Sequence, residues 1–81
     1  MKPIVVYTQV GCGPCQAEKA WLAQQGIPFE ERDIHQNPEW IQELVRLGST
    51  GTPTTVIGEG ADRTVILGFH PQRLAQALEL L

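Results

Sequence analysis

Two cysteines with only two residues between them, Cys12 and Cys15, stand where a predicted strand ends and a predicted helix begins. The preceding run, Ile4 to Thr8, is β-branched and aromatic, as is typical of a buried strand. The following residues, from Pro14 to Gln25, have helical spacing and are followed by Gly26 as a stop signal. A disulfide that closes so short a loop would constrain the unfolded chain very little. The position of the pair therefore favours sulfur chemistry over structural stabilisation.

The rest of the chain continues this alternation of strand and helix. We predict a second strand from Pro28 to Ile34, a helix capped by Asn37 and ending at Gly48, strands at Thr54–Ile57 and Arg63–Leu67, and a last helix from Pro71. The order strand, helix, strand, helix, hairpin, helix implies a parallel unit followed by an antiparallel pair. This is an α/β architecture, β-α-β-α-β-β-α, with a four-stranded mixed sheet flanked by three helices. It corresponds to a minimal thioredoxin-like fold.

The apolar residues at helical spacing predict which helix faces are buried. In the first helix, Glu18 and Leu22 share one face, and Ala17, Ala20, Trp21 and Gln24 share another. The second helix has the stripe Trp40, Ile41, Leu44, Val45 and Leu47, and the last has Leu74, Ala77, Leu78 and Leu81. We predict that Trp21 and Trp40 belong to the core and that Tyr7 packs at the end of its strand. Lys19 is predicted to be a solvated charge.

Length and charge restrict the classes of function. A chain of 81 residues holds one domain, residues 1–81, with a single core. The formal charge of -3 leaves no basic stripe for nucleic acid and no polybasic patch for a membrane surface. The first residues lack the apolar run of a signal peptide, and no apolar stretch approaches the length of a membrane span. We therefore expect a cytoplasmic protein without nucleic-acid or membrane partners.

The two cysteines are expected to have different roles. Cys12 lies at the N-terminus of the helix, where unpaired backbone N–H groups and the helix dipole stabilise a thiolate. Cys15 lies nearly one turn further along, so its sulfur can displace a substrate thiol that is bound to Cys12. Between them, Gly13 allows a substrate backbone to approach and Pro14 is tolerated in the first helical turn. The pattern thus predicts an attacking and a resolving thiol.

Pro53 is a second candidate for the site, because it follows Thr52 in a loop just before a predicted strand. We predict a cis Thr52-Pro53 bond. Such a turn would leave the backbone N–H and C=O of Thr52 free to pair with an extended substrate beside Cys12. An ordinary turn proline is the alternative interpretation.

These residues together resemble the glutaredoxin-like redoxins, and in particular the NrdH type, over nearly the whole chain. The marks of the resemblance are Tyr7 and Thr8, the two cysteines, Lys19, Gly26 to Glu30, Pro38 and Glu39, Gly48, Pro53, and the element Gly68, Phe69 and Pro71. The resemblance implies a dithiol oxidoreductase that reduces protein disulfides, such as that of ribonucleotide reductase. It further implies electrons from NADPH through thioredoxin reductase, no tightly bound cofactor, and a monomer. Gly68 and Phe69 join the expected substrate-binding set, with Phe69 either docking a partner or packing in the core.

The chain departs from the family pattern in ways that bear on its reductant. Gln9 stands where the family usually has a lysine or arginine, so a cation expected near a glutathione carboxylate is missing. The paired glycines and acidic cap typical of glutathione-binding members are absent, and His70 takes the place of the cap. A glutathione-dependent glutaredoxin remains an alternative. So does a non-catalytic module that binds a metal or an iron–sulfur cluster, although the spacing of His35 and His70 from the cysteines matches no ordinary zinc site.

Overall fold

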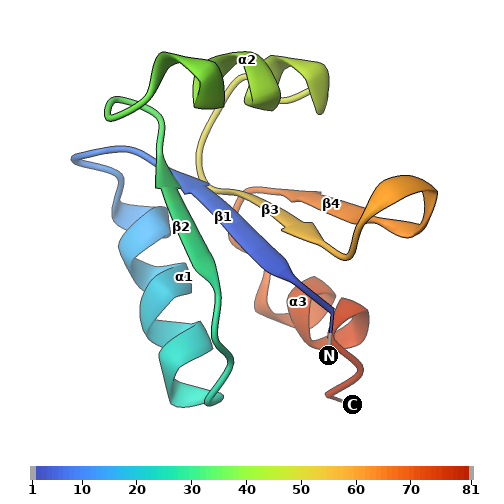
Figure 1. The fold of residues 1–81 in the computed structure, drawn as a ribbon. Coiled ribbons are helices and arrows are strands. Elements are labelled where there is room, and N and C mark those ends of the chain that lie inside the picture. Colours follow the sequence, from blue (N-terminus) through green and yellow to red (C-terminus); the bar gives the residue numbers. More distant parts are fainter. Residues whose placement is uncertain (1, 81) are drawn as a thin grey trace.

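A computed structural model describes residues 2–80 of the chain (Figure 1). Its elements are β1 (Ile4–Thr8), α1 (Gly13–Gln24), β2 (Glu30–Asp33), α2 (Pro38–Arg46), β3 (Thr54–Ile57), a short 3₁₀ turn η1 (Gly60–Asp62), β4 (Thr64–Leu67) and α3 (Pro71–Ala77). The predicted order of strands and helices is confirmed. The η1 turn occupies the predicted connection between the last two strands.

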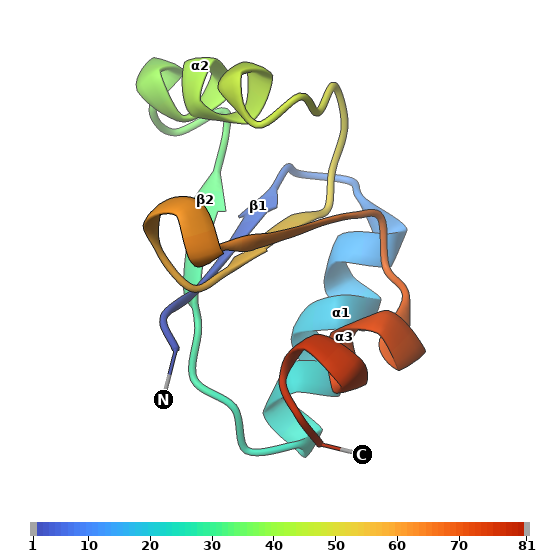
Figure 2. The same cartoon turned by 90° about the vertical axis from the view of Figure 1, so that its right-hand side faces the viewer.

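The four strands form one mixed sheet in the order β2-β1-β3-β4. Strand β1 pairs in parallel with β2 and antiparallel with β3, and β3 pairs antiparallel with β4. This topology confirms the predicted parallel unit followed by a hairpin. Helices α1 and α3 lie together on one side of the sheet, and Figure 2 shows α2 on the other side, beyond one end of the strands.

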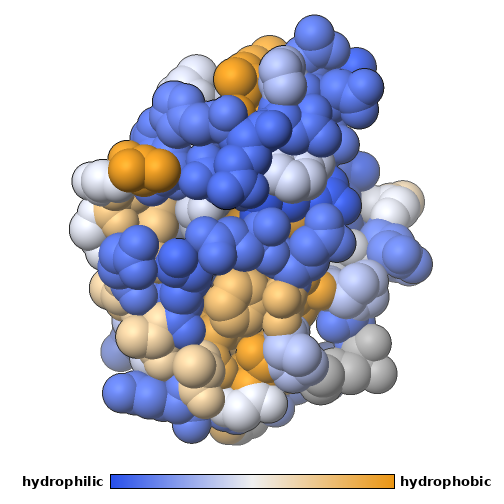
Figure 3. All heavy atoms as spheres, turned by 60° about the vertical axis from the view of Figure 1, so that its left-hand side comes forward, coloured by the Kyte–Doolittle hydropathy of each residue, from blue (hydrophilic) through white to orange (hydrophobic). Residues whose placement is uncertain are grey.

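The main core lies between the sheet and the pair α1 and α3. It consists of buried residues from three strands, two helices and a loop: Ile4, Val6, Leu22, Ile27, Ile57, Ile66 and Leu74. Trp21 and Phe69 are partly buried and pack against this cluster. The opposite side of α1 is exposed and carries Ala17, Ala20 and Ala23. On this side of the molecule, Figure 3 shows apolar atoms mixed with hydrophilic ones.

Polar contacts attach α2 to the other face of the sheet. The Tyr7 hydroxyl donates to Glu43 Oε1 at 2.8 Å, and Arg32 Nη1 donates to the same oxygen at 2.5 Å. Burial, followed by the neighbouring Glu43 carboxylate, raises the pKa of Tyr7. Tyr7 therefore does more than pack, because it joins β1 to α2.

The predicted apolar stripe of α2 is wrong in part. Leu44 is its only buried residue, Trp40 is half-buried, and Ile41 and Val45 are 43% and 64% exposed. The helix lies beyond the end of the strands, so the sheet covers only a narrow part of its surface.

Several predicted boundaries are also too wide, namely those of β2, α2, β4 and α3. The second strand begins at Glu30, which pairs with Val5, because Pro28 cannot donate to the ladder. Helix α3 ends at Ala77, since Glu79 adopts a left-handed backbone with φ of 60°. Leu81, which the prediction included in this helix, lies outside the described residues. Among residues 2–80, no helix has the length and apolar character needed to cross a membrane.

Candidate active site

Cys12 and Cys15 are joined in a disulfide at the start of α1, with their Cα atoms 5.2 Å apart. Cys12 is the N-cap of the helix, and its sulfur accepts a hydrogen bond from the Cys15 backbone N–H at 3.1 Å. Its side chain is partly exposed, whereas Cys15 is 0% exposed. A substrate therefore has access to the sulfur of Cys12 and not to that of Cys15. Gly13 and Pro14 form the exposed first turn of the helix between them.

The Thr52-Pro53 peptide bond is cis, which confirms the prediction. Pro53 is buried, and its carbonyl accepts the Gly68 backbone N–H at 2.8 Å. Gly68 has a φ of +82°, a conformation that side chains disfavour. The structure thus brings Gly68 to the Pro53 loop, while the Phe69 ring packs partly against the core.

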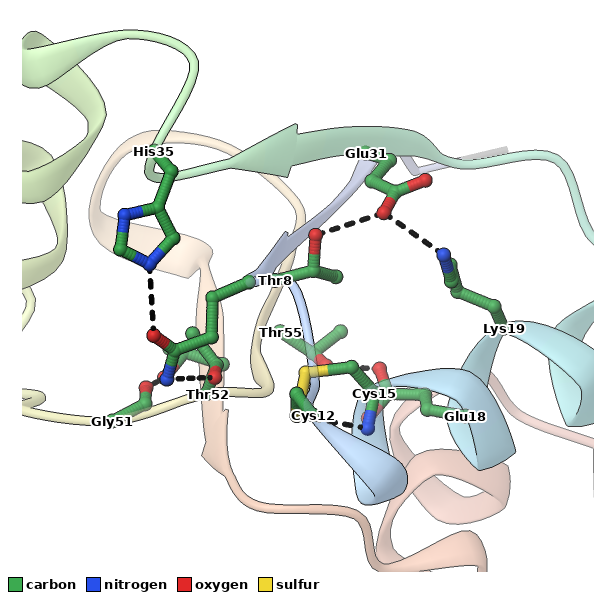
Figure 4. Close-up of a disulfide and its surroundings, with 12 residues drawn as sticks. Thr8, Cys12, Cys15, Glu18, Lys19, Glu31, His35, Gly51, Thr52 and Thr55 are labelled. Carbon is green, nitrogen blue, oxygen red and sulfur yellow. Dashed lines mark hydrogen bonds and ion pairs between the residues drawn. A yellow bond between two sulfur atoms is a disulfide. The ribbon is translucent and has the colours of Figure 1, made fainter.

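Gln9 connects three loops at the edge of the site. Its Nε2 donates to Thr52 Oγ1 at 2.9 Å, and its Oε1 lies 3.2 Å from His35 Nε2 (Figure 4). Its backbone carbonyl also accepts the Cys12 N–H at 3.3 Å. The uncharged amide therefore bridges the Thr52 loop, the loop before α1 and the loop after β2.

An ion pair lies on the sheet near the disulfide. Lys19 Nζ is 3.0 Å from Glu31 Oε2, and the Thr8 hydroxyl donates to the same oxygen at 2.8 Å. The hydrogen bond from Lys19, followed by that from Thr8, lowers the pKa of Glu31. Lys19 was predicted as a solvated charge, and its side chain is 24% exposed, but the ion pair fixes its direction, because α1 points the ammonium toward β2 (Figure 4).

Glu18 is the residue of the site that the sequence reasoning missed. Its side chain is 0% exposed, on the buried stripe of α1 that also includes Cys15 and Leu22. The Thr55 hydroxyl of β3 donates to Glu18 Oε2, and Glu18 Oε1 has no hydrogen-bond partner among the described residues. Burial raises the pKa of this carboxyl, an effect that the hydrogen bond from Thr55 partly offsets. The available signal was the shared helical face of Glu18 and Leu22, three and seven residues after Cys15.

Comparison with known proteins identifies the family of this chain. The glutaredoxin family model matches residues 4–60. This chain belongs to the glutaredoxin family. Among its relatives is the glutaredoxin-like protein NrdH of Lactococcus lactis subsp. lactis strain IL1403, which is 29% identical over 73 residues, or 90% of this chain and 96% of that protein.

Two solved structures place this glutaredoxin within the thioredoxin-like fold. The thioredoxin-like protein BC3987 is 35% identical, with a TM-score of 0.82 over 91% of this chain and 97% of that one. The NrdH-redoxin from Escherichia coli is 26% identical, with a TM-score of 0.78 over 91% of this chain and 92% of that one.

With its family and its cysteine pair established, the protein is a thiol-disulfide oxidoreductase of the glutaredoxin family. Across the part of the chain that the structure describes, no three or more His, Cys, Asp and Glu side chains cluster in a way that could hold a metal ion.

Glu18→Gln tests the ionisation of the buried carboxyl. A raised pKa means that the folded state binds this proton more tightly than the unfolded state does. The resulting stability is present below the ordinary carboxyl pKa of 4.5 and is lost as pH rises through the raised pKa of the folded protein. We expect the free energy of unfolding of the oxidised wild-type protein to fall, relative to that of Glu18→Gln, over the pH range that begins near this ordinary value and extends upward.

Urea denaturation of both oxidised proteins across this pH range measures the effect. Glu39→Gln, which changes an exposed carboxyl, is the matched control and should follow the wild type. Parallel curves for wild type and Glu18→Gln would contradict a raised pKa.

Proposed function

We propose that this glutaredoxin is an NrdH-type electron donor that receives electrons from NADPH through thioredoxin reductase. It passes them to protein disulfides, of which that of ribonucleotide reductase is the expected example. Cytoplasmic location, a monomeric state and the absence of a tightly bound cofactor belong to the same proposal. The observation that carries it is Gln9, whose neutral amide bonds to Thr52 and His35 at the position where the family resemblance calls for a cation.

The named relatives support this assignment. One is called NrdH, and the solved Escherichia coli NrdH-redoxin is described as having a thioredoxin-like activity profile. The Gly13-Pro14 dipeptide between the cysteines is also that of thioredoxin. A thioredoxin-like potential of about -270 mV would suit a reductant of protein disulfides better than the roughly -200 to -230 mV of glutaredoxins.

The exposures of the two cysteines support an ordered reaction. The Cys12 thiolate attacks one sulfur of the target disulfide, forms a mixed disulfide and releases the other sulfur as a thiolate. The sulfur of Cys15 then attacks that of Cys12, and the electron pair of the broken bond leaves with the second target sulfur. The target gains two electrons, and the protein ends as the observed Cys12–Cys15 disulfide. Cys12 is thus the proposed nucleophile and Cys15 the resolving thiol.

We propose that substrate is bound by residues of the first turn of α1, of the cis-proline loop and of the loop that follows β4. They are Gly13, Pro14, Thr52, Pro53, Gly68 and Phe69. Thr52 lies in a loop, and its backbone N–H and C=O form no hydrogen bond with another backbone group among the described residues. Both groups are therefore free to pair with an extended target segment. Phe69 would present only the part of its ring that the core leaves open.

Paired reduction assays test the electron source. We expect NADPH-dependent reduction of insulin disulfides with thioredoxin reductase, and at least about tenfold slower turnover with glutathione and glutathione reductase. Cys12→Ser should lose turnover in both assays. Turnover with the glutathione system alone would contradict the proposal and favour a glutathione-dependent glutaredoxin, and a protein without any turnover would favour a binding module.

Gln9→Lys tests whether the missing cation excludes glutathione. An ammonium about 4 Å from a glutathione carboxylate gains about 1 kcal/mol in water, so glutathione-dependent turnover should rise roughly fivefold. Gln9→Met is the matched control, because it removes the bonds to Thr52 and His35 without adding charge. An equal response of both variants in the glutathione-coupled assay would show that the amide bonds, and not the missing charge, set the reductant.

A further inference from the structure

A carboxyl group without an ionic partner is buried beside the resolving thiol. Glu18 and Cys15 are three residues apart on the buried stripe of α1, a spacing that puts their Cβ atoms about 5–6 Å apart. Both side chains are 0% exposed. Figure 4 shows the Glu18 side chain reaching from α1 toward Thr55, with the disulfide in front of this bond in the view.

The hydrogen bonding of this carboxyl leaves one oxygen unused. Thr55 satisfies Oε2, and Oε1 is buried without a partner among residues 2–80. A buried polar atom without a partner costs free energy comparable to that of a lost hydrogen bond. The oxidised protein tolerates this cost at a position where a proton has to move when the disulfide opens or closes.

The charged groups nearby are occupied elsewhere. On α1, the neighbouring Lys19 forms an ion pair with Glu31 of β2, which also accepts from Thr8 of β1. From β3, Thr55 faces the carboxyl with a neutral hydroxyl. The buried cluster that packs under α1 is apolar, and its members from β4 and α3 are Ile66 and Leu74. Cys15 is therefore the ionisable group with which Glu18 is placed to exchange a proton.

We propose that Glu18 is the proton acceptor for Cys15 when the mixed disulfide is resolved, and the proton donor to Cys15 when the disulfide is reduced. The proposal rests on the assignment of Cys12 as nucleophile and Cys15 as resolving thiol. Because Cys15 is closed off from solvent, a group inside the protein has to take or supply its proton.

The step balances as follows. The Cys15 thiol gives its proton to the Glu18 carboxylate as its sulfur bonds to the Cys12 sulfur. The bond between Cys12 and the target sulfur breaks, and the target leaves as a thiolate that takes a proton from water. In the reverse direction, a reductant thiolate attacks the Cys12 sulfur, Cys15 leaves with the electron pair, and the Glu18 carboxylic acid protonates it.

Burial acts in the direction that this exchange needs. It raises the pKa of Glu18 and so brings it closer to that of a thiol. The free-energy difference between the proton on the thiol and the proton on the carboxylate becomes smaller as a result. Oxidation leaves the carboxyl protonated, which is the form that a buried carboxyl without an ionic partner favours.

The two sulfur steps are separated by mixing a limiting amount of the chromogenic disulfide 5,5′-dithiobis(2-nitrobenzoate) with excess reduced protein. Attack by Cys12 releases the first nitrothiobenzoate, and resolution by Cys15 releases the second. In Glu18→Gln, we expect the first phase to stay within about twofold and the second to slow at least about tenfold at pH 7. Its rate should keep rising with pH over a range in which the wild-type rate has already levelled off.

Thr55→Val tests the same proposal without altering Glu18. Removing the hydroxyl removes the hydrogen bond that partly offsets the raised pKa of Glu18. The midpoint of the pH dependence of the second-phase rate should therefore move to higher pH. Glu39→Gln is the control with an exposed carboxyl, and its two phases should match those of the wild type.

Failure of this proposal is distinguishable from failure of the cysteine assignment. If the assignment is correct, Cys12→Ser loses both phases and Cys15→Ser loses only the second. A second phase in Glu18→Gln with the wild-type rate and pH profile would overturn the role of Glu18. So would an equal slowing of both phases, since this would mark a general structural effect.

Discussion

The rest of the site depends on the burial of one narrow stripe of α1 against the sheet. Cys15, Glu18 and Leu22 share this stripe, and none of them is exposed to solvent. Leu22 contributes apolar contact with the core, and removing such a side chain from water is worth about 1.5–3 kcal/mol. Once this side faces inward, the first turn of the helix presents Cys12 at the surface and encloses Cys15. The asymmetry between the two thiols therefore follows from helix packing.

The charges around the site are neutralised in pairs, with one exception. Lys19 pairs with Glu31 on one face of the sheet, and Arg32 pairs with Glu43 on the other. Partly exposed pairs of this kind contribute little to stability, and their main effect here is to orient side chains. Among residues 2–80, Glu18 has only a neutral hydroxyl as its partner. A fold of this size retains such a group at a cost, and its position beside Cys15 suggests that the cost is connected with the redox reaction.

Local signals in the sequence predicted much of the fold. Strand β3 was predicted with its bounds because Pro53 and Gly58 limit it on both sides, and the cis bond before Pro53 was predicted from its place in the loop. The environment of Glu18 could not be predicted in this way. Whether a helix face with one glutamate turns inward depends on contacts with β3, which lies 37 residues further along the chain at Thr55. The exposure of α2 likewise depends on how much of it the sheet covers.

The proposed roles of Cys12 as the nucleophile and Cys15 as the resolving thiol are tested most directly by alkylation. The reduced protein is treated briefly with limiting iodoacetamide at pH 7, and the labelled peptides are identified by mass spectrometry. Iodoacetamide reacts with the thiolate, which the helix N-terminus stabilises at Cys12 and which burial disfavours at Cys15. The account predicts that the first equivalent of label is found at Cys12 and that Cys15 stays unmodified until the protein is unfolded. Predominant labelling of Cys15, or equal labelling of both cysteines, would contradict it.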